Sequence, residues 1–208
     1  ANENPNDNGL NRYPDPLQRK LKARISELKN VPTKNIFLGN GSDEAIDLLF
    51  RGFCEPVKDR ALICSPTYGM YQVSADINDV EVIDVPLTSK WQLNLDGIRS
   101  HFSDANLKLI FICSPNNPTG NSMNHKDILA LVSEFNGLVV IDEAYIDFAE
   151  TKSLSSELEQ SNNLVILQTL SKAWGLAAIR LGMAFANTEV IDVLNRIKPP
   201  YNVNQLTQ

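Results

Sequence analysis

The chain has 208 residues, of which 43% are hydrophobic and 21% are charged, and its formal net charge is −6 at pH 7. These values are typical of a globular protein with one sizeable core, and they argue against disorder, collagen-like repeats and coiled coil. An acidic chain without a basic cluster is not expected to bind nucleic acid or an anionic membrane surface. The apolar runs, such as residues 138–141, are too short for a membrane helix.

Cysteine and histidine usage favours an intracellular protein without a metal site. Cys54, Cys64 and Cys113 lie among apolar neighbours, which predicts buried, reduced thiols in a cytoplasmic protein. His101 and His125 have no other Cys or His at ligand spacing, so we expect no zinc.

The first elements in chain order are an arm and a helix. Residues 1–16 are rich in Asn, Asp and Pro, which predicts an extended N-terminal arm before the packed remainder, residues 17–208. A helix is expected to open at Asp15-Pro16, with Asp15 as its cap and Gln18 completing a capping-box-like pattern. Its apolar stripe would consist of Leu17, Leu21, Ile25 and Leu28.

A second helix and an alternating pattern follow. Residues 40–42 predict a turn, and Asp43 and Glu44 would begin a helix that ends at Phe53, because acidic residues suit the positive end of a helix dipole. Beyond it we predict strands at 60–64, 80–85, 107–113, 138–142, 164–168 and 182–186, and helices at 69–78, 94–102, 124–136 and 188–197. The last helix should stop before Pro199-Pro200. The alternation predicts an α/β fold with a mostly parallel sheet and helices on both faces.

Polar residues follow four of the predicted strands. Two strands end in the same letters, Ile63-Cys64-Ser65-Pro66 and Ile112-Cys113-Ser114-Pro115, and two others end in Asp142-Glu143-Ala144-Tyr145 and Thr169-Leu170-Ser171-Lys172. In open α/β sheets, ligands bind beyond the carboxyl ends of the strands. The sequence therefore predicts one site at this edge.

The residue types at that edge exclude several classes of catalytic or binding site. They include no Ser/His/Asp order, Cys/His pair or paired metal ligands, and Gly39-Asn40-Gly41-Ser42 matches neither a P-loop nor a dinucleotide fingerprint. A lysine Schiff base to pyridoxal 5′-phosphate (PLP) would explain the set. An Asp keeps the pyridine nitrogen protonated, Asn and Tyr bond the phenolic oxygen, and a helix start with hydroxyls and an Arg binds the phosphate.

Seven ordered motifs carry a family resemblance. Ser114-Pro115-Asn116-Asn117-Pro118-Thr119-Gly120, Asp142-Glu143-Ala144-Tyr145 and Ser171-Lys172-Ala173 with Arg180-Leu181-Gly182 resemble the fold-type I PLP-dependent aminotransferases. More narrowly, the chain resembles the histidinol-phosphate aminotransferase family, through Asn2-Glu3-Asn4-Pro5, Arg12-Tyr13-Pro14-Asp15, Gly41-Ser42-Asp43-Glu44 and Pro66-Thr67-Tyr68-Gly69-Met70-Tyr71. The resemblance runs in order from residue 2 to about residue 200.

The resemblance implies a role for each matching residue. Lys172 would bind PLP covalently and then move a proton between the substrate Cα and the cofactor C4′. Asp142 would pair with the pyridinium, Asn117 and Tyr145 would bond the phenolate, and Tyr68 would stack on the ring. The phosphate would be held by the backbone of Ser42 and Asp43 and by Thr169, Ser171 and Arg180. Tyr13 resembles the family's arm tyrosine, which reaches the phosphate in the partner subunit of a homodimer.

Several readings of single residues stay open on the sequence alone. Asp142 could be a helix or turn cap, and Asn117-Pro118 a simple turn, for which we expect a cis peptide if the turn is functional. Tyr68 and Tyr71 could both be core aromatics, and Tyr13 could pack within its own subunit.

The implied reaction is transamination between L-histidinol phosphate and 2-oxoglutarate, which yields glutamate, in histidine biosynthesis. The alternatives are another enzyme on this scaffold (an aromatic or aspartate aminotransferase, or threonine-phosphate decarboxylase) and a PLP-fold sensor or dimerisation domain without activity. Family members continue past the equivalent of Gln208 into a small domain that carries an arginine for the acceptor carboxylate. We therefore expect residues 17–208 to be an incomplete large domain, and the segment before Asn2 to be clipped.

Overall fold

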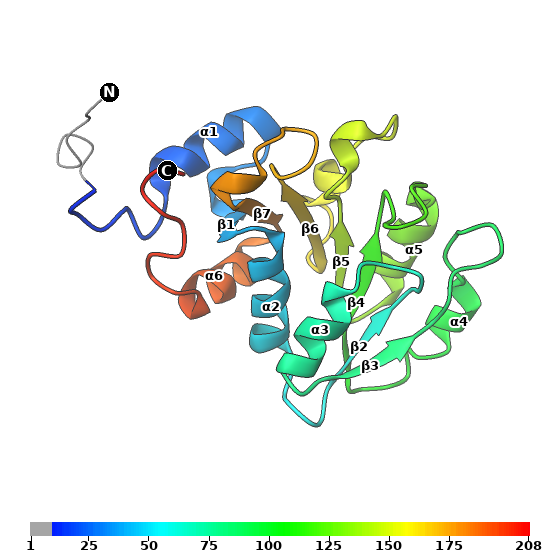
Figure 1. Ribbon diagram of the computed structural model, residues 1–208. Coiled ribbons are helices and arrows are strands. Elements are labelled where there is room, and N and C mark those ends of the chain that lie inside the picture. The colour runs from blue at the N-terminus through cyan, green and yellow to red at the C-terminus, as the bar shows by residue number, and fades with distance from the viewer. Residues whose placement is uncertain (1–9) are drawn as a thin grey trace.

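The computed structural model describes residues 10–208, which form a seven-stranded sheet between two layers of helices (Figure 1). The strands are β1 (Ile36–Asn40), β2 (Arg60–Ile63), β3 (Glu81–Asp84), β4 (Leu107–Cys113), β5 (Leu138–Asp142), β6 (Leu164–Thr169) and β7 (Leu181–Phe185). They lie in the order β1-β7-β6-β5-β4-β2-β3. Neighbouring strands from β3 to β6 are parallel, and β7 is antiparallel to both β6 and β1.

Successive strand side chains point to opposite faces of the sheet, so apolar side chains emerge on both faces. Helices cover each face and enclose one apolar core there. One core packs helices α2 (Ser42–Phe53), α3 (Met70–Ile77) and α6 (Thr188–Ile197), through residues such as Leu49, Tyr71 and Leu194. The other packs α1 (Arg19–Lys29), α4 (Leu95–Arg99) and α5 (His125–Glu134). Short 3-10 turns lie at Thr33–Asn35, Ile146–Phe148, Leu154–Glu157 and Ala177–Ile179. The expected α/β architecture with a mostly parallel sheet is confirmed.

Strand β1 was not expected from the sequence. Its apolar run is only Ile36, Phe37 and Leu38, yet β7 pairs with it antiparallel and all three side chains are fully buried in the cores on the two faces of the sheet. Residues 36 and 38 point into one core and residue 37 into the other.

The predicted start of the first helix is wrong by several residues. Helix α1 begins at Arg19, since Gln18 has a left-handed backbone (φ 48°). Asp15 still accepts the amides of Leu17 (3.0 Å) and Arg19 (2.9 Å), but the Gln18 side chain leaves the capping pattern and donates to Asn202 Oδ1 instead. The predicted stripe is also only half buried, because Leu17 and Leu28 are exposed.

Other boundaries lie close to the expectation. Helix α6 ends at Ile197, two residues before Pro199, and β4 and β5 have the predicted bounds.

Cys64 and Cys113 are buried free thiols, whereas Cys54 is partly exposed. The Asn117-Pro118 peptide is cis, as expected, and so are Ser65-Pro66 and Ser114-Pro115. Within residues 10–208, no helix has the length and apolarity needed to cross a membrane.

The N-terminal arm is described from Leu10 onward. The motif Asn2-Glu3-Asn4-Pro5 lies outside the described residues. In Figure 1 the arm (blue) runs beside the C-terminal segment (red), away from the strands β2 and β3 at the opposite end of the sheet.

Candidate active site

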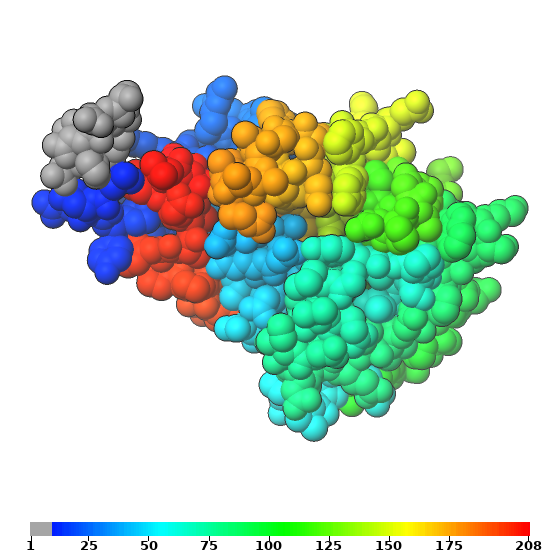
Figure 2. Space-filling model, viewed as in Figure 1, coloured from blue at the N-terminus to red at the C-terminus, as the bar shows by residue number. Residues whose placement is uncertain are grey.

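The carboxyl ends of β4, β5 and β6 meet the loop before α2 around one pocket. Its lining contains every predicted site residue except Tyr13, and three further residues, Gly41, Cys113 and Ala144. The full lining is Gly41, Ser42, Asp43, Tyr68, Cys113, Asn117, Asp142, Ala144, Tyr145, Thr169, Ser171, Lys172 and Arg180. The loop after β6 that carries Lys172 and Arg180 (orange in Figure 2) lies at the surface beside the start of α2 (light blue). Residues more than a hundred positions apart in the sequence therefore share one cavity.

Asp142 forms the floor of the pocket as a buried carboxylate. It is the last residue of β5 and only 2% exposed. The Tyr71 hydroxyl donates to Oδ2 (2.8 Å) and the Ala144 amide donates to Oδ1 (3.0 Å). Burial raises the pKa of Asp142 above its usual range, although both hydrogen bonds oppose the rise. A cationic group from a ligand would stabilise the ionised form of this carboxylate.

The start of α2 and Arg180 also line the pocket, and they present N–H donors of the kind that bind an anion; this group is called the anion cradle below. Gly41 precedes the helix with φ +80° and supplies no side-chain cap, so the first amides of α2 remain available as donors. A Cβ on Gly41 would lie 2.5 Å from Arg180 Nη2, so only glycine lets the guanidinium approach this close. Gly182 on β7 is equally constrained, because its Cβ would lie 2.1 Å from Ser42 N.

Two hydroxyls complete the cradle. Thr169 Oγ1 lies 3.0 Å from Ser171 Oγ and accepts the Ser171 amide at 3.1 Å. Thr169 ends β6, so the antiparallel return into β7 brings its hydroxyl 3.2 Å from Leu181 O. Together with Arg180 and the amides of α2, these groups offer the donors that a phosphate requires.

Lys172 lies at the mouth of the pocket, in the loop between β6 and β7. Its Nζ lies 5.4 Å from the centre of the Tyr145 ring. The Lys172 side chain is exposed.

Tyr68 and Asn117 enter the pocket from the neighbouring strand ends. The Tyr68 hydroxyl donates to Asp43 Oδ1 (3.1 Å), and burial, with the Asp43 charge, raises the pKa of Tyr68 to about 12. Asn117 lines the cavity, whereas its neighbour Asn116 is buried and donates to Pro66 O (2.9 Å), so it joins the two Ser-Pro turns. Tyr68 thus lies in the pocket, while Tyr71 is a fully buried aromatic.

Tyr13 lies outside the pocket of its own chain. It is 79% exposed and stacks on Tyr201, with ring centroids 4.3 Å apart and an interplanar angle of 12°.

Sequence reasoning missed Tyr71, Gly41 and Cys113. Tyr71 follows Tyr68 by three residues and lies in the first turn of α3. The sequence gives no sign that the Tyr71 hydroxyl donates to Asp142; only the fold shows this contact. Gly41 was recognised only as a turn residue, although its close approach to Arg180 depends on the absence of a Cβ. Cys113 ends β4 beside Asp142, and nothing in its sequence context distinguished it from Cys64.

The donor set fits a ligand with a cationic ring nitrogen at one end and a phosphate at the other. A cation would stabilise the ionised form of the buried Asp142 carboxylate, and the cradle of amides, hydroxyls and Arg180 favours a phosphate. PLP carries both groups, and Lys172 lies at the same cavity.

Comparison with known proteins identifies the class. The model of the family "aminotransferase class I and II" matches residues 1–208, and the chain belongs to this family. Among its relatives, the histidinol-phosphate aminotransferase of Cytophaga hutchinsonii is 58% identical over the whole chain, and that of Bacteroides fragilis is 57% identical. The chain spans 61% and 60% of the length of these two relatives.

Solved structures share the fold. The histidinol-phosphate aminotransferase of Clostridium acetobutylicum has a TM-score of 0.85 at 26% identity, over 98% of this chain and 61% of that one. The enzyme of Sinorhizobium meliloti, solved in complex with PLP, has a TM-score of 0.86 at 22% identity, over 96% of this chain and 55% of that one.

Proposed function

We propose that the complete protein is a PLP-dependent aminotransferase that converts L-histidinol phosphate and 2-oxoglutarate to imidazole-acetol phosphate and glutamate, a step of histidine biosynthesis. The observation that carries the proposal is the pocket in which Asp142, Lys172 and the α2 cradle meet. The 58% identity to a histidinol-phosphate aminotransferase supports the choice of substrate.

Each side of the pocket has a part in holding PLP. Asp142 would pair with the ring nitrogen, and Asn117 and Tyr145 would bond the phenolic oxygen. Tyr68 would cover one face of the ring. The amides of Ser42 and Asp43, the hydroxyls of Thr169 and Ser171, and Arg180 hold the phosphate; all of these residues line the cavity.

The chemistry divides between the cofactor and the protein. When bound, PLP supplies an electron sink for the pair released when the substrate Cα–H bond breaks. The chain's own task is to keep Asp142 ionised against the ring nitrogen, and the Tyr71 and Ala144 donors favour this state. Lys172 Nζ would take the proton from the substrate Cα and deliver it to C4′ of the cofactor within the same half-reaction.

We further propose a cytoplasmic homodimer with composite sites. Tyr13 projects from the arm and is exposed, which suits a residue that contacts a partner subunit. The free cysteines Cys54, Cys64 and Cys113 are consistent with the reducing cytoplasm. Residues 10–208 offer the cofactor-binding groups, and we place the group that binds the acceptor carboxylate beyond Gln208.

The test is turnover by the complete protein. With histidinol phosphate and 2-oxoglutarate we expect PLP-dependent formation of glutamate, and the Lys172→Ala variant should form none. Turnover of phenylalanine, aspartate or threonine phosphate without turnover of histidinol phosphate would contradict the proposed substrate. Binding of PLP without any turnover would favour the sensor alternative.

A further inference from the structure

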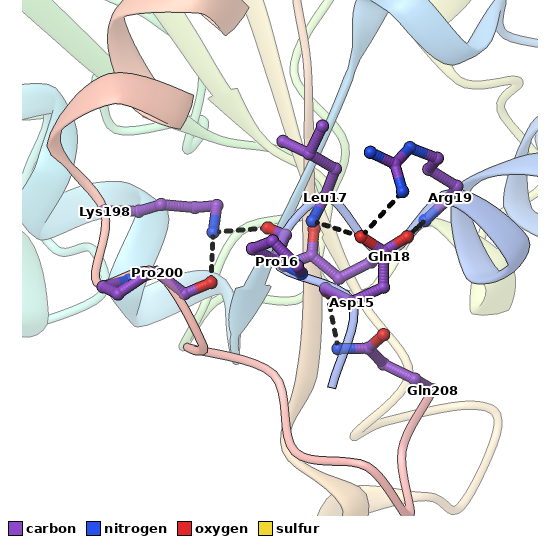
Figure 3. Close-up of polar contacts among 8 residues, drawn as sticks. All are labelled: Asp15, Pro16, Leu17, Gln18, Arg19, Lys198, Pro200 and Gln208. Atoms are coloured by element: carbon purple, nitrogen blue, oxygen red, sulfur yellow. Dashed lines mark hydrogen bonds and ion pairs between the residues drawn. The ribbon is translucent and has the colours of Figure 1, made fainter. Parts of the chain in front are cut away.

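Lys198, directly after α6, has an ammonium group buried among oxygen atoms. Its side chain is 7% exposed, and Nζ lies 2.8 Å from Pro16 O, 3.1 Å from Asn202 Oδ1 and 3.2 Å from both Pro199 O and Pro200 O. Figure 3 shows the contacts to Pro16 and Pro200. Because an ammonium has three N–H groups, each of them finds an acceptor in this cage.

Burial of this ammonium group costs free energy unless its hydrogen bonds compensate for the lost hydration. Among residues 10–208 no carboxylate forms an ion pair with Lys198, and burial lowers its pKa, with Glu44 and Asp15 opposing the shift from a distance. A lysine at a helix end can usually extend its charged head into water. Lys198 instead turns inward, and one of its acceptors belongs to the N-terminal arm, 182 positions away in the sequence.

The C-terminal segment holds the arm at several points. Lys198 holds the carbonyl of Pro16, Gln208 Nε2 donates to Asp15 O (3.1 Å), and Gln18 donates to Asn202 Oδ1 (3.0 Å). A few residues earlier, Tyr13 stacks on Tyr201. Residues 13–18 therefore lie along residues 198–208, as Figure 1 also shows.

Asn202 fixes this clamp to the sheet. Its Nδ2 donates to Leu38 O on β1 and to Glu44 Oε2 in the first turn of α2, both at 3.0 Å. Glu44 also accepts the amide of Asn40. The arm base is thus attached through Lys198 and Asn202 to the element whose N-terminus forms the anion cradle.

We propose that Lys198 is a positioning residue that fixes the base of the arm and thereby directs Tyr13 toward the phosphate of the cofactor bound in the partner subunit. This inference rests on the proposed function. Lys198 touches neither cofactor nor substrate, and its effect passes through the arm. The affected quantity is therefore affinity for the phosphate of PLP rather than for its ring.

The test uses the complete protein with Lys198→Met, which keeps the length of the side chain and removes its donors. We expect affinity for PLP to fall about tenfold, a usual size for coupling between sites, while affinity for pyridoxal, which lacks the phosphate, stays unchanged. Because Lys198 acts through Tyr13, the substitution should add little in a Tyr13→Ala background. Lys108→Met is the matched control, since Lys108 also donates to a backbone carbonyl (Ala105 O, 2.7 Å) but lies near the amino end of the inner strand β4, at the end away from the pocket.

Hydrogen exchange separates this inference from the proposed function. Amides of residues 11–19 should exchange faster in Lys198→Met than in the wild type, whether or not PLP is present. If Lys198→Met does not fold, Gln208→Met, which removes one peripheral link to Asp15, should show the same pattern to a smaller extent. Unchanged exchange, or equal losses for PLP and pyridoxal, would overturn the role of Lys198. A wild type that binds no PLP would instead contradict the proposed function.

Discussion

At the scale of single residues, the hydrogen bond from the Tyr71 hydroxyl favours the ionised form of Asp142. It donates to a carboxylate that is fully enclosed, and burial already raises the pKa of that carboxylate. Tyr71→Phe removes a hydrogen bond to the ionised form, so the pKa of Asp142 should rise further. We expect kcat/KM to fall about tenfold at pH 7, and the acidic limb of the pH profile to move to higher pH.

The control for this prediction separates packing from charge. Tyr71 stacks on Phe111 with centroids 4.9 Å apart, and Phe keeps that stack. Phe111→Leu disturbs the packing and leaves the hydroxyl in place, so it should lower the free energy of unfolding without moving the acidic limb. An acidic limb that stays in place in Tyr71→Phe would show that the hydroxyl does not act on Asp142.

Gly41 allows a second prediction at this scale. Gly41→Ala places a methyl group 2.5 Å from Arg180 Nη2 and forces Ala to a φ of +80°. Gly120→Ala is the matched control, because Gly120 has a φ of +77° but no atom within 4 Å of the added Cβ. Both should lose about 1 kcal/mol of stability through backbone strain.

Only Gly41→Ala should also lose affinity for PLP, about tenfold or more, because it displaces one charge-assisted donor from the phosphate. Titration of the apo protein with PLP, followed by absorbance, measures this difference. Equal affinities of the two variants would show that Arg180 does not hold the phosphate.

At the scale of elements, the contact between α1 and α6 encloses a lysine with few partners. Lys22 is 9% exposed, and among the described residues its ammonium group has a single hydrogen bond, to Asn195 Oδ1 at 3.4 Å. Burial, together with the charge of Lys198, lowers the pKa of Lys22 to about 8. The unfolded chain, in which lysine titrates near 10.4, therefore binds more protons than the folded chain between about pH 8 and 10. Stability should rise with pH in that window.

Lys22→Met should remove this dependence. At pH 7 the free energy of unfolding should increase by up to about 3 kcal/mol, since each pKa unit corresponds to about 1.4 kcal/mol. Urea unfolding at pH 7 and pH 10 measures both effects. Lys20→Met, at an exposed position on the same helix, should change neither. A loss of stability in Lys22→Met would mean that the ammonium stabilises the contact.

The elements also show how far the sequence could predict the fold. Residues 107–113 and 138–142 have apolar runs that specify buried parallel strands on their own, and the structure has them as predicted. Strand β1 has a run of only three apolar residues, and it forms because β7 returns antiparallel beside it. Such pairing is a tertiary effect that local patterns do not contain.

In the pocket, too, local motifs predicted some features and tertiary contacts determine the others. Strand-end motifs predicted which residues line it, because parallel strands bring their carboxyl ends to one edge. The Tyr71–Asp142 hydrogen bond and the Lys198 cage join residues 71 and 182 positions apart, and no short motif encodes such distances.

At the scale of the whole molecule, the exposed arm tyrosine predicts sites shared between subunits. Lys172→Ala and Tyr13→Ala should each be nearly inactive. In a mixed dimer, one site would hold Lys172 together with an intact Tyr13 from the other subunit. Mixing the two variants through unfolding and refolding should restore about a quarter of the wild-type activity, because half the dimers are mixed and each has one intact site. Absence of recovery would place Tyr13 in its own subunit's site.

The central claim is that the pocket at the carboxyl edge of the sheet binds PLP through Lys172. Borohydride reduction makes a linkage between lysine and PLP permanent, so reduction of the PLP-treated complete protein, followed by peptide mapping, tests the claim directly. We predict one pyridoxyl group, on the peptide that contains Lys172, and its loss in Lys172→Ala. A protein without label, or with the label on another lysine, would contradict the assignment of this pocket.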